Sequence, residues 1–211
     1  MDPIFMADAA RAVHLLGLAL GLGFAIKADY FASRFVLRPI SDYELASLYT
    51  YHRTISFGLA LFWISGIALL WLRTGFVAEN FSPKLMAKIA VVSLLTINAV
   101  LIGRYGLTTL RKSRNFRLGD LTFWRRLQLC TIGALSSASW VGALVLGVFQ
   151  MMKTMPPIMM WETLGAIYLA AMIGALMIVL LAPAIGTTVV RPRKPLVIGQ
   201  EYRMQNLQPA P

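Results

Sequence analysis

A histidine precedes two glycines in the first apolar stretch of the sequence. His14 is followed by Gly17 and Gly21 at positions i+3 and i+7, so on a helix all three share one face. Histidine is a common axial ligand of haem iron, and a flat strip of glycines beside it would admit a porphyrin ring. The same glycines would also suit a small-xxx-small contact between packed helices, with His14 hydrogen-bonded nearby. The spacing leaves both interpretations open.

Lys88 is the expected partner of His14. Ser82 and Pro83 form a helix-start signal. From the rise per residue, Lys88 lies about 8 Å and His14 about 10 Å below the same edge of the membrane. An amine at this depth would contact a haem propionate, ligate the iron or handle a proton, which makes Lys88 the candidate catalytic residue. The alternative is a lysine that extends to the membrane surface.

A second polar cluster is expected near the other end of the first helix. It comprises Lys27, Asp29, His52, Arg53 and Asn98. A lone charge in a membrane span is costly, so Asp29 should pair with Lys27 or Arg53; a proton route through Asp29 and His52 is the alternative. Asn98 should make an interhelical hydrogen bond. In a straight hairpin the two histidines differ in level by about 21 Å, which excludes one bis-histidine site.

A methionine-rich segment offers a different kind of ligand. Met151, Met152 and Met155 lie between two apolar stretches, and thioethers suit Cu(I), although methionine is also an ordinary interfacial hydrophobe. The single cysteine, Cys130, is expected to pack in the interior. The sequence has no phosphate loop, HExxH, CxxCH or paired catalytic carboxylates, so hydrolase and nucleotide-driven functions have no support.

The elements that carry these residues are membrane-spanning helices. The chain of 211 residues is 58% hydrophobic and 14% charged, against about 25% charged in soluble domains, and its uncharged stretches reach the length needed to cross a bilayer. The sequence predicts an all-α bundle of five spans, a four-helix core plus one. The expected spans are 9–37, 42–72, 83–107, 127–150 and 161–181. They form one domain over residues 1–190, followed by a basic, flexible tail at 191–211.

Lysine and arginine counts predict the orientation of these spans. Fourteen basic residues lie in the first turn, the 104–126 loop and the tail, against five on the opposite side. By the positive-inside rule the N-terminus is outside and the C-terminus in the cytoplasm of a bacterial inner membrane. The net charge of +11 therefore indicates membrane topology rather than a nucleic-acid partner.

Three runs of sequence resemble a known superfamily. They are Ala12-Val13-His14-Leu15-Leu16-Gly17, "GLALFWISG" at 58–66 and "PKLMAKIAVVSLL" at 83–95. Their layout resembles small bacterial membrane proteins that include haem-containing protoporphyrinogen oxidases, copper-resistance D proteins and uncharacterised families. The resemblance covers about residues 9–107. It implies a helix bundle in which His14 and Lys88 take the place of the oxidases' functional histidine and lysine.

Three functional hypotheses follow. The first is a b-type haem protein that exchanges electrons with a quinone or a porphyrin substrate. The second is a copper-handling protein that uses Met151, Met152, Met155 and His14. The third is a cofactor-free assembly subunit whose basic 104–126 loop contacts anionic lipid, a second copy or another membrane protein.

Overall fold

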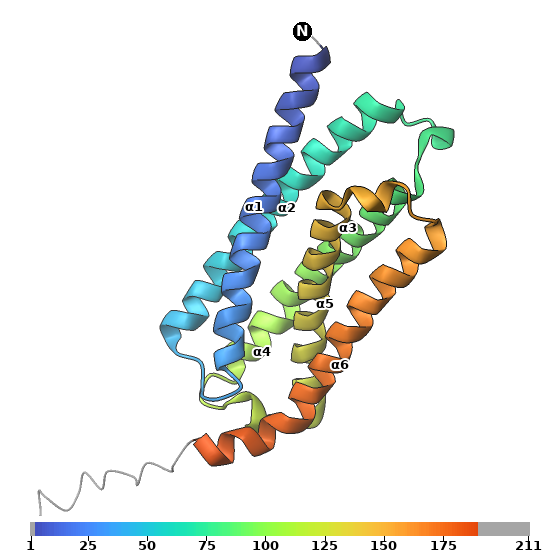
Figure 1. Ribbon diagram of the computed structural model, residues 1–211. Helices are drawn as coiled ribbons and strands as arrows, with labels where there is room; N and C mark the ends of the chain where they lie inside the picture. Colours follow the sequence, from blue (N-terminus) through green and yellow to red (C-terminus); the bar gives the residue numbers. More distant parts are fainter. Residues whose placement is uncertain (1–2, 190–211) are drawn as a thin grey trace, which may run out of the picture.

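The computed structural model describes residues 3–189, and these residues form helices and connecting loops without a strand. Figure 1 shows the helices running roughly side by side. They are α1 (Pro3–Arg34), α2 (Asp42–Thr74), α3 (Pro83–Leu101), α4 (Leu107–Lys112), α5 (Phe123–Val148) and α6 (Pro157–Val189). The all-α prediction is confirmed for this part of the chain, and the predicted tail at 191–211 lies outside the described residues.

Five helical segments of this structure are long and apolar enough to cross a membrane, as predicted. The third span is continuous over Pro83–Lys112, because α3 passes into α4 through a π-helical segment, η2 (Ile102–Gly106). The fourth helix begins at Phe123 rather than near 127. Large apolar side chains such as Ile26, Ile64 and Leu180 face outward, which suits contact with lipid.

The helix ends have capping residues that can be recognised in the sequence. Ser41 and Glu44 form a reciprocal capping box at the start of α2, and Arg38 donates to the buried Glu44 carboxylate. That hydrogen bond raises the pKa of the Arg38 guanidinium above its ordinary value. Gly75 ends α2 in the left-handed conformation, at φ 59°, which glycine adopts without steric cost.

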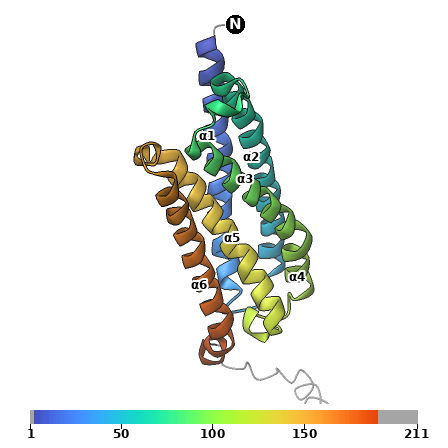
Figure 2. The ribbon, with the colours of Figure 1, turned by 90° about the vertical axis from the view of Figure 1, so that its right-hand side faces the viewer.

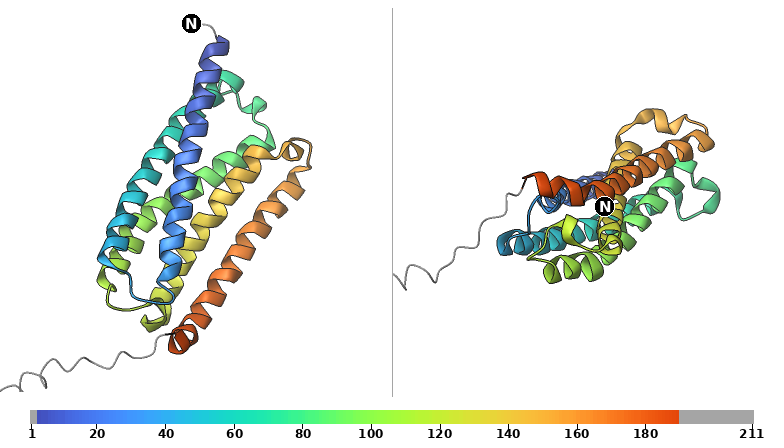
Figure 3. Two further views of the ribbon diagram at one scale, coloured as in Figure 1. Left: turned by 60° about the vertical axis from the view of Figure 1, so that its left-hand side comes forward. Right: turned by 90° about the horizontal axis from the view of Figure 1, so that it is seen from below.

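The bundle consists of a helix pair and a group of three helices. α1 packs along α2, whereas α3 and α6 both pack on α5, so α2 and α6 lie at opposite edges (Figures 2 and 3). At the α1–α2 crossing, a β-carbon built on Gly17 would lie 2.8 Å from the Gly58 carbonyl oxygen. Only glycine permits so close an approach, and the crossing fixes how α1 sits on α2.

The two ends of the bundle carry different connections. The N-terminus, the 75–82 connection and the 149–156 connection lie at one end, and the 35–41 and 113–122 connections lie at the other (Figure 1). The backbone N–H of Leu118 donates to the Phe35 carbonyl and ties the last two together. The first turn and the basic 104–126 segment therefore share one end, as the orientation argument required. Which side of the membrane that end occupies stays a prediction.

Candidate functional site

His14 and Lys88 line one cavity near the N-terminal end of the bundle. This cavity, called here the His14 cavity, has a volume of about 610 Å³ and lies between α1, α2, α3 and α5. Small-molecule and cofactor sites typically enclose about 300–1,000 Å³. The two residues were expected at matching depth, and the structure brings them to the same cavity.

Ser65 is the hydrogen-bond partner of the His14 ring. His14 Nδ1 lies 3.0 Å from Ser65 Oγ. Ser65 Oγ also lies 2.7 Å from the Leu61 carbonyl oxygen and 3.2 Å from the Phe62 carbonyl oxygen of its own helix. When the hydroxyl proton is donated to Leu61, Ser65 accepts from a protonated Nδ1, and the Nε2 lone pair is left for another partner. A metal-ligating histidine is commonly held in this way.

Aromatic and small residues of α2 hold the imidazole in place. The ring stacks on Phe62 with centroids 3.9 Å apart. A β-carbon built on Gly66 would lie 3.5 Å from its Cε1 atom, in ordinary van der Waals contact. Trp63, another residue that lines the cavity, donates from its indole N–H to Thr96 Oγ1 at 2.8 Å and so links α2 to α3. His14 is thus fixed by packing as well as by Ser65.

Basic side chains gather at the His14 cavity. Lys88, Arg73 and Arg11 all line it. Arg11 pairs with Asp8, whereas no ion pair among residues 3–189 includes Lys88 or Arg73. Lys84 is not part of this set, because its Nζ donates to the Phe149 carbonyl at 2.9 Å. The cavity therefore offers two uncompensated cations to an anionic ligand.

The two glycines below His14 face neighbouring helices. Gly17 contacts the α2 backbone at Gly58 and Phe62, and a methyl group on Gly21 would overlap the Trp140 ring. Neither glycine lines the His14 cavity. Their placement corresponds to the close-packing interpretation, and a porphyrin ring would have to lie in the cavity rather than on the glycine strip.

The expected ion pair of the second polar cluster does not form. Asp29 Oδ2 accepts from Ser137 Oγ of α5 at 2.7 Å, and no ion pair in the described part of the chain includes Asp29. Lys27 lies over the Phe24 ring instead, because residues i and i+2 of a helix point in different directions. Arg53 is exposed on α2.

The other two members of that cluster lie apart from each other. Asn98 is fully buried and donates to the Ile132 carbonyl at 2.9 Å, which confirms the predicted interhelical hydrogen bond. His52 packs on η2, where a β-carbon on Gly103 would lie 2.7 Å from its Nε2 atom. His52 and His14 line different cavities, in agreement with the expectation that they do not share one ligand.

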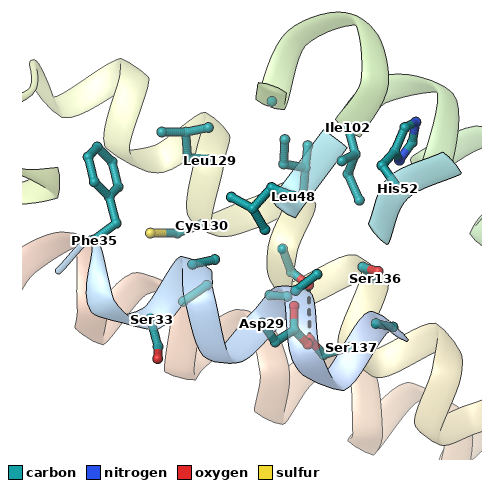
Figure 4. Close-up of a pocket in the computed structure, with 18 of the residues that line it drawn as sticks. Asp29, Ser33, Phe35, Leu48, His52, Ile102, Leu129, Cys130, Ser136 and Ser137 are labelled. Atoms are coloured by element: carbon teal, nitrogen blue, oxygen red, sulfur yellow. Dashed lines mark hydrogen bonds between the residues drawn. The ribbon is translucent and has the colours of Figure 1, made fainter. Parts of the chain in front are cut away.

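A second cavity lies toward the opposite end of the bundle. It has a volume of about 450 Å³, is lined mainly by apolar residues of α1, α2, the α3–η2–α4 span, α5 and α6, and is called here the Asp29 cavity. Figure 4 shows the Asp29–Ser137 hydrogen bond on its wall, with Leu48, Phe35 and Cys130 among the apolar surroundings. Cys130 is half-buried there, rather than packed in a closed interior.

The three candidate copper-binding methionines have different environments. Met152 is buried in an apolar cluster with Leu146 and Met160, and Met155 packs against the same cluster. Met151 is 62% exposed. These contacts are those of ordinary hydrophobic packing, and no contact in the structure favours the copper hypothesis, which stays a prediction. The described residues contain no group of three or more His, Cys, Asp or Glu side chains placed to hold a metal ion.

Sequence reasoning missed three residues of these sites. Arg73 of α2 lines the His14 cavity, and Ser65 of α2 is hydrogen-bonded to His14. Ser137 of α5 donates a hydrogen bond to Asp29. Arg73 could have been found from its depth, because it lies in the last turn of α2. Ser65 and Ser137 are 51 and 108 residues from their partners, and only the rotation of the packed helices brings them together.

Comparison with known proteins adds no assignment, because no family model, curated protein or solved structure matches this chain.

Proposed function

We propose that this protein binds b-type haem in the His14 cavity and works as a membrane redox protein. The observation that carries the proposal is that His14 lines a cavity of cofactor size while its Nδ1 atom is hydrogen-bonded to Ser65. With the proton on Nδ1, the Nε2 lone pair would be left for iron. The resemblance of His14 and Lys88 to the functional pair of the membrane protoporphyrinogen oxidases supports the same assignment.

The residues around the cavity suit the chemistry of a haem group. Its walls are apolar and aromatic, from side chains such as Phe62, Trp63 and Val92, and they suit the faces of a porphyrin. Lys88 and Arg73 would neutralise the two propionates, or Lys88 would be the second axial ligand. Haem bound here would supply one-electron redox chemistry whose potential depends on its axial ligands. Electrons would be exchanged with a quinone or a porphyrinogen.

Two histidine variants test the assignment. The His14→Ala variant should lose haem, because Nε2 is the proposed ligand, whereas His52→Ala should keep the wild-type haem content, because His52 lines the other cavity. Haem per protein is measured by the pyridine haemochrome method after purification in detergent. Equal haem content in His14→Ala and wild type would overturn the proposal.

A further inference from the structure

The Asp29 cavity is hollow because the helices around it present small residues. α1 contributes Ala25, Ala28 and Ala32 at helical spacing on one face, and α5 and α6 contribute Gly133 and Gly174. A β-carbon built on either glycine would meet no atom within 4 Å. Protein interiors are otherwise close-packed, so a hollow of about 450 Å³ is space that a ligand can use.

Asp29 is the acidic group of this cavity and has no counter-charge in the described residues. The described ion pairs leave it out, and the nearest basic residue on its own helix, Lys27, lies over Phe24. The other titratable groups that line the cavity are His52 of α2 and Cys130 of α5, while the α3–η2–α4 span and α6 contribute only apolar residues. Asp29 is exposed on α1, and a carboxylate that faces the apolar part of a membrane is costly, so a proton or a bound cation would stabilise it there.

Ser137 can satisfy the carboxyl group in both states. Its Oγ lies 2.7 Å from Asp29 Oδ2 and 3.1 Å from the Gly133 carbonyl oxygen. When Asp29 is ionised, Ser137 donates to the carboxylate. When Asp29 is protonated, the carboxyl group donates to Ser137, which donates in turn to Gly133. The site is therefore suited to a carboxyl group that exchanges its proton for another positive charge.

We propose that the Asp29 cavity binds a lipophilic organic cation, which pairs with the Asp29 carboxylate after displacing its proton. The apolar walls hold the hydrocarbon part of the ligand and the carboxylate selects its charge. A neutral apolar molecule would gain no ionic contact with Asp29, and an anion would be repelled by the carboxylate. The proposal does not depend on haem in the His14 cavity.

The test uses two probes of the same shape and opposite charge. Radiolabelled tetraphenylphosphonium and tetraphenylborate are equilibrated by dialysis against the full-length protein in detergent, with protein-free micelles as the blank. The phosphonium should bind at one site per chain, and more tightly as pH rises, because the proton competes for Asp29. The borate should not exceed the blank.

Variants separate charge from shape. Asp29→Asn should weaken phosphonium binding at least tenfold, and Gly133→Leu should weaken it as well by filling the cavity, where the added side chain has room. Asp8→Asn, an exposed aspartate of the same helix, should bind like wild type, and His52→Ala should keep the pH dependence. Wild-type affinity in Asp29→Asn, equal binding of the borate, or no phosphonium binding would each overturn the proposal.

Discussion

Ser65 determines what His14 can do, although it would not itself touch a bound group. Its hydroxyl oxygen lies 2.7 Å from the Leu61 carbonyl oxygen and 3.0 Å from His14 Nδ1, so it can accept from His14 while donating to the α2 backbone. The hydrogen bond and the stacking on Phe62 together orient the imidazole ring. Outer-shell partners of this type commonly change metal affinity when removed.

The Ser65→Ala variant should bind haem about 10–100-fold more weakly than wild type, because His14 would lose the hydrogen-bond partner of its Nδ1 atom. Haem titration of protein purified without haem measures this affinity. The matched control is Ser56→Ala, a serine of the same helix that bonds only its own backbone, at His52. Equal affinities in the two variants would show that Ser65 does not orient His14.

The pairing of His14 with Lys88 could be predicted at the residue scale, and the partner of Asp29 could not. Depth along a helix follows from the position of the turn and the rise per residue, which was enough to bring His14 and Lys88 to one cavity. The hydrogen bond from Ser137 to Asp29 depends on how α1 and α5 are rotated about their axes. No local pattern encodes that rotation.

At the scale of elements, the α1–α2 crossing positions the His14 cavity. Gly17 lets the backbones of the two helices approach, and the residues one turn away on each helix, His14 and Phe62, then stack. Gly23, on the same helix, faces open space. The two glycines therefore provide a matched pair for measuring the contribution of this crossing.

Gly17→Ala should destabilise the protein by about 1–3 kcal/mol, because the added methyl group overpacks the crossing. Gly23→Ala should be neutral or stabilising by up to about 1 kcal/mol, because alanine favours helix over glycine. Unfolding in mixed micelles of increasing SDS fraction gives both free energies. A Gly17→Ala variant as stable as Gly23→Ala would contradict the close contact.

The existence of the elements was predictable, and some of their ends were not. Ser41 with Glu44, and Ser82 with Pro83, mark two helix starts correctly. The last span was expected to begin near 161, but α6 begins at Pro157, where the missing N–H of proline costs nothing. The third span was expected to end near Leu107, yet η2 carries the helix on to Lys112. A π-helical insertion has no sequence signature comparable to a cap.

At the scale of the whole molecule, the distribution of basic residues sets the expected orientation. The 35–41 turn and the 104–126 segment share one end, and the cytoplasm should be on that side. The His14 cavity would then open toward the outer half of the membrane and the Asp29 cavity toward the inner half.

Single-cysteine labelling tests that orientation. In a Cys130→Ser background, Glu79→Cys should react with a membrane-impermeant maleimide added to spheroplasts, because Glu79 is exposed in the 75–82 connection. Asn115→Cys, exposed at the opposite end, should react only after the membrane is opened. The reverse pattern would place the N-terminus in the cytoplasm.

The number of spans and the sharing of one end by the basic segments followed from composition alone, because hydropathy and charge are properties of stretches of sequence. The cavities are different. They arise where separate helices contribute small residues, as α1 does with Ala28 and α6 with Gly174 at the Asp29 cavity, and this depends on the complete packing.

The reduced-minus-oxidised visible spectrum of the detergent-purified protein, expressed with ample haem supply, tests the central claim most directly. Haem held by His14 predicts a sharp alpha band of the b-type cytochrome class that is absent from the His14→Ala variant. A featureless spectrum from folded wild-type protein would contradict the haem assignment.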